Sequence, residues 1–307
     1  MPVSPLDLHN SNILITGPTG QVAAPIVDAL SKIANVTALA RFSKDNDKTA
    51  LEQRGVKVIR ADLADKGSLA ACPDDFDYVL NLAVVKSGNF DYDLAANAEG
   101  VGNLMARCRS AKAFVHFSST AVYEYAGPVP RKETDPLGDN HRAMFPTYSI
   151  AKIAAESVCR FAAKQFDIPT TIARLSVPYG NNGGWPFFHL LMMKENMEID
   201  IHPEGPNSYN LLHADDYIEK IPYLLAAASK EVITINFGGS QAVSIEEGGA
   251  YLTELTGFEP KFSEKTTAFG SLAIDTTRMR ELIGEPRVDW REGLRGMIEN
   301  LAPNLLR

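Results

Sequence analysis

Cysteine is scarce in this sequence, and the few that occur are far apart. Cys72, Cys108 and Cys159 are the only ones among 307 residues, and none belongs to a CxxC pair. An odd, scattered set excludes a disulfide framework and a zinc cluster, and it is typical of a reducing compartment. We therefore expect a cytoplasmic protein.

Long apolar runs, a secretion signal and an excess of positive charge are also lacking. No run approaches the ~18 apolar residues of a membrane-spanning helix, and the start has no basic-then-apolar pattern. The net charge of −8 disfavours binding to nucleic acid or to an anionic membrane. The six histidines form no motif such as HExxH. We expect no metal, nucleic-acid or membrane partner.

What the sequence does contain is a series of short apolar runs separated by helical patterns. The strand candidates lie at 12–16, 36–40, 56–59, 78–81, 113–117 and 170–173. The helical patterns between them include 21–31, 94–109 and 148–165. This alternation predicts an α/β fold with a doubly wound parallel sheet. After residue 175 the order changes to a turn-rich stretch followed by short helices and strands.

A glycine-containing turn follows the first strand candidate and opens the first helical pattern. Its residues, 16–23, read TGPTGQVA. Small residues let the backbone approach a pyrophosphate, and the helix amino end adds free N–H donors. A tight turn without a ligand has the same pattern. The position at the first strand-to-helix turn favours a dinucleotide.

The end of the second strand candidate bears on the choice between NAD and NADP. An acidic residue there would accept hydrogen bonds from the adenosine ribose and repel a 2′-phosphate. The sequence has Ala40 followed by Arg41, which could pair with a 2′-phosphate or simply be a surface arginine. We therefore favour NADP over NAD. Asp62, after the third strand, could meet the adenine or be an ordinary turn residue.

Tyr148 and Lys152 are four residues apart, which places them on one face of a helix. A tyrosine with its ordinary pKa of about 10 is a poor acid or base at neutral pH. A nearby ammonium lowers that pKa, so the pair could accept a proton from an alcohol as hydride leaves. A hydroxyl from Ser118–Thr120 would hold the substrate oxygen. Alone, this spacing is equally typical of a surface pair.

In this order the motifs resemble those of the extended short-chain dehydrogenase/reductase superfamily, in its NAD(P)-dependent epimerase/dehydratase branch. The resemblance covers nearly the whole chain. The matching segments are residues 16–23, 62–63, 81–84, 97, 119–123, 148–152, 174–180, 211–216 and 275–284. It implies a Rossmann-like domain with a smaller C-terminal substrate-binding lobe. We expect residues 1–175, with about 211–237, in the first and residues 176–210 and 238–307 in the second.

The resemblance also implies roles for individual residues. Ser119, Tyr148 and Lys152 would be catalytic, and Lys152 would also bind the nicotinamide ribose. The cofactor-binding residues would be Gly17, Thr19, Gly20, Gln21, Val22, Arg41, Asp62, Leu63, Leu82, Ala83, Val84, Asn97, Tyr148, Lys152 and Ser176. Many relatives dimerise through the helices that match 94–109 and 148–165, so we expect a homodimer.

Three departures from the family pattern bear on the substrate. Val177 replaces an asparagine, Tyr209-Asn210 replaces a segment with an arginine, and residues 266–270 lack the R-P-G-D sequence. Nucleotide-sugar enzymes need such groups to meet a diphosphate. The sequence favours an NAD(P)-dependent oxidoreductase that transfers hydride to or from a carbonyl or alcohol carbon of a small substrate.

Two other functions compete with this interpretation. The main alternative is an NAD-dependent nucleotide-sugar epimerase or dehydratase, which regenerates its own cofactor. A further alternative is a regulator that senses the dinucleotide without catalysis. The complete Ser119, Tyr148 and Lys152 set argues against a regulator, because a sensor needs no proton donor.

Overall fold

Seven parallel strands form the larger sheet, in the order β11-β6-β5-β4-β1-β2-β3. The computed structural model describes residues 2–307. The strands are β1 (Asn12–Thr16), β2 (Asn35–Ala40), β3 (Lys57–Arg60), β4 (Tyr78–Asn81), β5 (Ala113–Ser119), β6 (Thr170–Leu175) and β11 (Ile233–Phe237). Every neighbouring pair is parallel. The predicted doubly wound sheet is confirmed, and its order reverses between β1 and β4.

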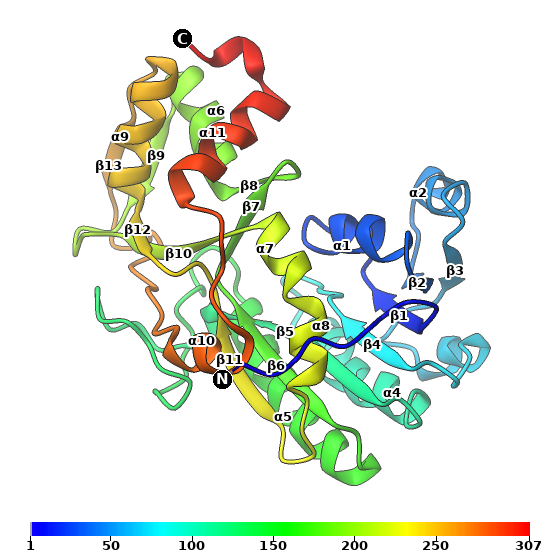
Figure 1. Cartoon of the computed structure of the whole chain (residues 1–307). Helices are drawn as coiled ribbons and strands as arrows, with labels where there is room; N and C mark the ends of the chain where they lie inside the picture. Colours follow the sequence, from blue (N-terminus) through cyan, green and yellow to red (C-terminus); the bar gives the residue numbers. More distant parts are fainter. Residues whose placement is uncertain (1) are drawn as a thin grey trace.

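Helices cover both faces of this sheet because strand side chains alternate between the faces. Ile13 and Ile15 pack in one buried cluster, and Leu14 packs in the other. The first face carries α1 (Ala23–Leu30), α7 (Ala214–Glu219), α8 (Ile221–Ala226) and α10 (Thr277–Ile283). The second carries α4 (Gly100–Arg107) and α5 (Tyr148–Phe166). Figure 1 shows α1 and α7 above the sheet and α4 and α5 below it.

The predicted helix at 94–109 is a composite of three segments. α3 (Phe90–Leu94) leads into a π-helical turn, η2 (Ala95–Glu99), which continues as α4. π-helical turns often accompany functional residues, and this one contains Asn97. The remaining short elements of the first domain are α2 (Asp45–Glu52), η1 (Lys66–Ala71) and η3 (Thr120–Val122).

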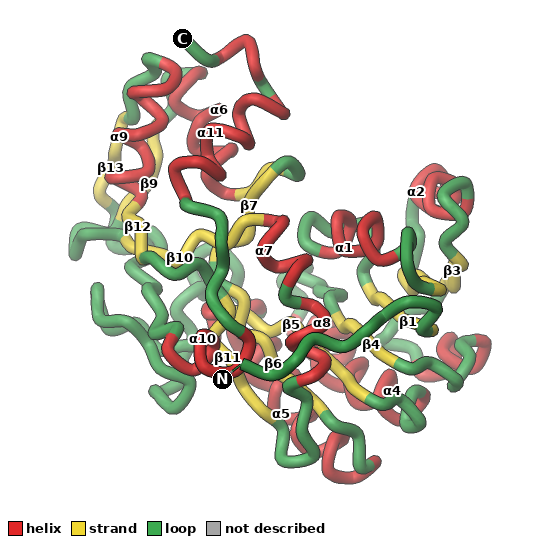
Figure 2. Tube along the Cα trace, viewed as in Figure 1, coloured by secondary structure: helices red, strands yellow, loops and turns green. Residues whose placement is uncertain are grey.

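The smaller lobe is built on a mixed sheet in the order β12-β10-β7-β8. These strands are β7 (Val177–Gly180), β8 (Gly183–Gly184), β10 (Ser208–His213) and β12 (Ala242–Ser244). A two-stranded sheet and four helical segments complete it: β9 (Glu198–Ile201), β13 (Lys261–Glu264), α6 (Trp185–Lys194), α9 (Ile245–Thr256), α11 (Trp290–Leu301) and η4 (Pro303–Leu305). Figure 2 shows these helices gathered at the end that carries the C-terminus.

The expected division of the chain differs from the structure near residue 211. Strand β10 pairs with β7 and β12, so residues 211–213 belong to the smaller sheet. The chain returns to the large sheet only at α7, α8 and β11. Residues 214–226 form two helices because the helix breaks at Lys220, two residues before Pro222. Between residues 2 and 307, no helix has both the length and the apolar character needed to cross a membrane.

Candidate active site

A cleft of about 230 Å³ lies at the carboxyl ends of β1, β2, β3 and β4, where the strand order reverses. Open α/β sheets bind their ligands at such a point. Ten of the predicted cofactor residues line it: Gly17, Thr19, Gly20, Arg41, Asp62, Leu63, Leu82, Ala83, Val84 and Asn97. The sequence interpretation missed others, including Ser43, Asp47 and Val85.

The glycine turn is tied closely to the end of β4. Gly17 has a φ of 64°, and a Cβ there would lie 2.8 Å from the Cα of Ala83. The Thr16 hydroxyl accepts hydrogen bonds from the N–H groups of Leu82 and Ala83, at 3.1 and 3.0 Å, and donates to Asn81 at 2.6 Å. The backbone contact therefore requires a residue without a side chain at position 17.

Where β2 and β3 end at the cleft, three polar side chains form a chain of hydrogen bonds. Arg41 donates to the Tyr92 hydroxyl at 2.5 Å, and that hydroxyl donates to Asp62 at 2.9 Å. Asp47 lines the same cleft. Arg41 is thus engaged by Tyr92, and the carboxylates of Asp47 and Asp62 line the cleft close to it. Tyr92 belongs to α3, and nothing in the local sequence predicts its contact with Arg41, which directly follows β2.

Asn97 fixes the loop that follows β4. Its side-chain oxygen accepts from the N–H of Val85, and its amide donates to the carbonyl of the same residue, both at 2.8 Å. A further bond to the carbonyl of Asp93, also 2.8 Å, anchors it to its own helix. Asn97 therefore both lines the dinucleotide cleft and shapes its border.

A second cleft, of about 330 Å³, adjoins the first and reaches into the smaller lobe. Ser119 and Tyr148 both line it, together with Gln21, Lys86 and Ser176. Strand alternation separates the two serines of β5. The Ser118 hydroxyl points away and donates to Glu156 at 2.7 Å, whereas Ser119 lies at the cleft. Val22 lies at the start of α1 and packs against the core.

The pKa of Tyr148 differs in direction from the sequence expectation. Burial raises the pKa of Tyr148, and a hydrogen bond with Ser119 only partly offsets that effect. Burial lowers the pKa of Lys152 to about 8, with Glu156 opposing the shift and Lys86 adding to it. The Lys152 ammonium donates to the carbonyl of Phe117 at 2.7 Å. This hydrogen bond holds the Lys152 ammonium near the carboxyl end of β5 and not on the hydroxyl of Tyr148.

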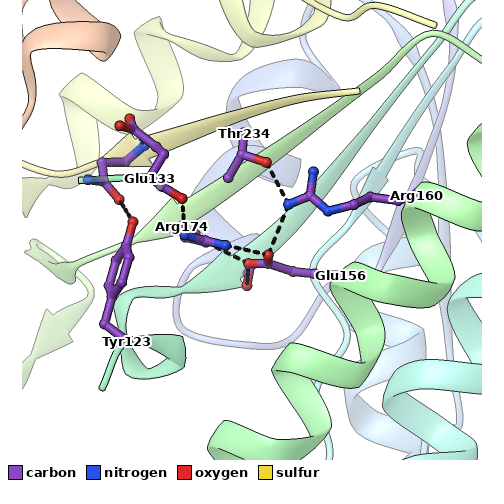
Figure 3. A network of polar contacts seen from close by, with 8 residues as sticks. Tyr123, Glu133, Glu156, Arg160, Arg174 and Thr234 are labelled. Carbon is purple, nitrogen blue, oxygen red and sulfur yellow. Dashed lines mark hydrogen bonds and ion pairs between the residues drawn. The ribbon is translucent and has the colours of Figure 1, made fainter. Parts of the chain in front are cut away.

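A buried ionic network lies between α5 and the large sheet, as Figure 3 shows. Arg174 of β6 donates two hydrogen bonds to Glu156 of α5, both 2.8 Å long. Arg160 donates to the same carboxylate at 3.2 Å and to Thr234 of β11 at 2.8 Å. Burial alone would raise the pKa of Glu156, but the hydrogen bonds and the positive charge of Arg174 outweigh it, so this pKa lies below its ordinary value. The network joins α5 to the strands beneath it.

Ser176 offers the second cleft a hydrogen-bonding group that could meet the nicotinamide of a dinucleotide. This serine is buried and lines the second cleft, and its hydroxyl has no hydrogen-bond partner within residues 2–307. A buried polar group without a partner costs free energy unless a ligand satisfies it. Such a hydroxyl fits a carboxamide at this position. Gln21 reaches across from the glycine turn to the carbonyl of Pro178, at 3.2 Å.

The substrate side of the second cleft is formed by apolar and aromatic groups. Val177, Tyr209 and Phe269 line it, in the three regions where the sequence departs from the family pattern. The Tyr209 hydroxyl donates to the carbonyl of Gly270 at 2.6 Å. Among the described residues that line this cleft, none carries a guanidinium or a carboxyl group, and Lys86 is the one cationic side chain.

A glycine turn at the switch point of a parallel sheet, next to a cleft lined by a serine and a tyrosine, with a buried lysine one turn further along the helix of that tyrosine, defines the extended short-chain dehydrogenase/reductase class of enzymes. Lys152 itself lines neither cleft. Within that class, the chain belongs to the NAD dependent epimerase/dehydratase family, whose family model matches residues 13–238. The resemblance identified from the motifs is confirmed. No protein of curated function matches the chain in sequence.

Solved structures with this fold share about a fifth of its residues. The UDP-glucuronic acid 4-epimerase from Bacillus cereus, in complex with UDP-glucuronic acid and NAD, is 21% identical, with a TM-score of 0.78 over 95% of this chain and 99% of that one. The UDP-glucose 4-epimerase from Thermotoga maritima, with UDP-glucose, is 22% identical, with a TM-score of 0.78 over 96% and 99%. The dTDP-glucose 4,6-dehydratase from Bacillus anthracis, with NAD, is 19% identical, with a TM-score of 0.80 over 96% and 97%. These likenesses establish the fold.

Proposed function

We propose that this enzyme works with a nicotinamide dinucleotide on the alcohol or carbonyl carbon of a small-molecule substrate, using Ser119, Tyr148 and Lys152. The observation that carries the proposal is the position of Ser119 and Tyr148. Both line a cleft that adjoins the dinucleotide cleft at the carboxyl edge of the sheet. When bound, the nicotinamide supplies the hydride acceptor or donor.

Ser119, Tyr148 and Lys152 have different roles in this proposal. The Ser119 hydroxyl holds the substrate oxygen, and Tyr148 takes its proton or returns one. The raised pKa of Tyr148 keeps the phenol protonated at neutral pH, which suits the step that returns a proton to a carbonyl oxygen. The step that takes a proton from an alcohol needs the phenolate, which the positive charge of Lys152 would favour. Lys152, bonded to the carbonyl of Phe117, holds its positive charge close to the reacting groups and binds the nicotinamide ribose.

For the reaction type, the family and the similar structures favour the alternative of the sequence analysis over its main interpretation. Several of those structures are epimerases or dehydratases crystallised with NAD, and these reactions return the hydride to the substrate. Epimerisation suits this cleft better than dehydration. Elimination of water needs a further acid to protonate the departing hydroxyl, and no carboxyl group lies among the described cleft residues.

A net oxidoreductase acting on a smaller, less charged substrate is the second candidate. The apolar cleft wall at Val177, Tyr209 and Phe269 favours it. A desolvated diphosphate needs several charged or amide donors. Within the described cleft, Lys86 is the one cation available for that role.

NAD is the cofactor we propose, in place of the NADP that Arg41 suggested. Two observations support NAD: Arg41 is engaged by Tyr92, and both Asp47 and Asp62 line the cleft close to it. The similar structures from Bacillus cereus and Bacillus anthracis contain NAD.

The expected homodimer would use α4 and α5, which pack side by side, and α5 exposes Phe161 to solvent.

The Tyr148→Phe variant tests the catalytic assignment. Turnover should fall by about 10²–10⁴-fold, because the general acid/base is lost, while NAD binding should stay within about twofold, because the dinucleotide cleft is intact. Tyr223→Phe, on α8, is the matched control. Turnover is followed by absorbance at 340 nm and by product analysis. Full activity in Tyr148→Phe would refute the proposal.

The same assay separates the two candidate reactions. Steady reduction of free NAD at 340 nm indicates a net oxidoreductase. Conversion of a nucleotide sugar without any net absorbance change indicates an epimerase. Running NAD and NADP in parallel tests the cofactor, and at least tenfold tighter binding of NADP would contradict our choice of NAD.

A further inference from the structure

Aromatic rings from three distant segments form one wall of the substrate cleft. Phe145 lies just before α5, Trp185 begins α6, and Phe269 follows β13. All three line the cleft and are only partly buried. Partly exposed aromatic rings gathered in a cleft are typical of a ligand site.

Phe269 is the centre of this wall. Its ring centroid lies 4.1 Å from that of His141, with the planes inclined at 24°. The rings of Phe145 and Trp185 are each 6.0 Å away. The Tyr209 hydroxyl donates to the carbonyls of Phe269 and Gly270, at 3.2 and 2.6 Å, and so fixes the loop that carries the ring.

His141 takes part in the wall as an uncharged ring. Burial and the nearby charge of Lys86 lower the pKa of His141 to about 4, so the imidazole is neutral at physiological pH. Its ring lies between those of Tyr148, at 6.0 Å, and Phe269. The one charged group at this wall is Lys86, whose ammonium lies 4.4 Å from the ring centroid of Phe145 and 5.5 Å from that of Tyr148. The part of the wall formed by Phe269, His141 and Trp185 is uncharged.

This geometry favours a flat, unsaturated ligand. Aromatic pairs gain about 0.5–1.5 kcal/mol beyond simple burial when they stack or meet edge to face. An apolar cavity of about 150 Å³ already accommodates benzene, and this cleft measures about 330 Å³. The space therefore suffices for an aryl ring together with a carbinol group.

We propose that the cleft takes a secondary alcohol or ketone that bears an aryl ring, with the ring against Phe269 and Phe145 and the oxygen toward Ser119 and Tyr148. This inference rests on the second candidate of the proposed function, a net oxidoreductase, since Ser119 and Tyr148 set the place of the oxygen, and it names the substrate class of that candidate. A nucleotide sugar is the competing ligand and forms one arm of the test.

The test compares the binding of 1-phenylethanol, 1-cyclohexylethanol and UDP-glucose to the full chain saturated with NAD, by calorimetry. We expect 1-phenylethanol to bind about tenfold more tightly than its cyclohexyl counterpart. Phe269→Leu, which keeps apolar bulk but removes the ring, should abolish that preference. Phe188→Leu is the matched control, because this phenylalanine is 62% exposed on α6.

Three results would overturn the inference: equal binding of the two alcohols, no effect of Phe269→Leu, or tighter binding of UDP-glucose than of 1-phenylethanol. Failure of the proposed function gives a different result. In that case 1-phenylethanol would bind with the expected dependence on Phe269, but no hydride transfer would be detected at 340 nm. The two proposals are therefore separable in one set of variants.

Discussion

At the scale of single residues, Gly17 meets two constraints that can be measured separately. Its φ of 64° is unfavourable for any residue with a side chain, and a Cβ would also lie 2.8 Å from Ala83. Gly55 shares the first constraint, with a φ of 78°, but a Cβ there would meet nothing within 4 Å. The two glycines therefore form a matched pair.

We predict that Gly17→Ala and Gly55→Ala both lose about 1–2 kcal/mol of unfolding free energy, the cost of a left-handed backbone with a Cβ. Only Gly17→Ala should lose NAD affinity, by tenfold or more, because the loop must move away from the end of β4 and distort the dinucleotide cleft. Urea unfolding and NAD titration give the two quantities. Equal NAD affinity in both variants would remove Gly17 from the cofactor site.

At the scale of helices and strands, the connection between α5 and the large sheet depends on Glu156. Glu156→Gln leaves the buried Arg174 without its counter-charge, which costs about 3–5 kcal/mol of unfolding free energy. Arg160→Gln removes a partly exposed partner of the same carboxylate and should cost about 0–1 kcal/mol. Urea unfolding of both variants measures the difference. Equal losses would mean that Arg174 contributes no more than a surface pair.

The same variants should differ in how stability depends on pH. The pKa of Glu156 is lowered in the folded protein from the ordinary 4.5. Its contribution is therefore present above about pH 4.5 and is lost as the pH falls through the lower, folded value. Glu156→Gln should remove this component of acid destabilisation, whereas Arg160→Gln should retain most of it.

The sequence predicted the strands of the large sheet well where the local pattern of apolar residues indicates a buried strand. The run Ile13-Leu14-Ile15 is buried on both faces, so its strand is evident from composition alone. The pairing of β10 with β7 and β12 does not follow from the sequence, because these partners are distant along the chain and the strand runs directly into α7. Sequence patterns identify strands but not which strand they pair with.

The candidate site shows the same limit. Ser119, Tyr148 and the glycine turn follow from motifs with fixed spacing. The Arg41–Tyr92–Asp62 chain joins three separate segments, and the wall around Phe269 joins three more. Such contacts depend on the packing of loops and leave no periodic signal. The pKa of Tyr148 also depends on such packing: burial raises it, and the Lys152 ammonium is hydrogen-bonded to the carbonyl of Phe117.

At the scale of the whole molecule, Asp216 connects the two parts of the chain. It lies on α7, which packs against the large sheet, and is itself buried. Its carboxylate accepts hydrogen bonds from the N–H groups of Arg287, at 2.7 Å, and Val288, at 3.2 Å. That segment leads directly into α11 of the smaller lobe. Asp216 thus ties the segment before α11 of the smaller lobe to α7 on the large sheet.

Asp216→Ala should therefore affect the two ligands differently. The dinucleotide cleft is lined by residues between Gly17 and Asn97, so NAD affinity should stay within about twofold. The substrate cleft includes Trp185, Tyr209 and Phe269 of the lobe. Without the Asp216 carboxylate, two backbone N–H groups lose their hydrogen-bond partner, each at a cost of about 1–3 kcal/mol in the stability of this contact. The lobe should then be held less firmly over the cleft, and KM should rise about tenfold. Asp215→Ala, beside it but exposed, should change neither quantity. If Asp216→Ala weakened NAD binding and left KM unchanged, the lobe would not be positioned through this carboxylate, and the substrate cleft would have to be held together by the sheet alone.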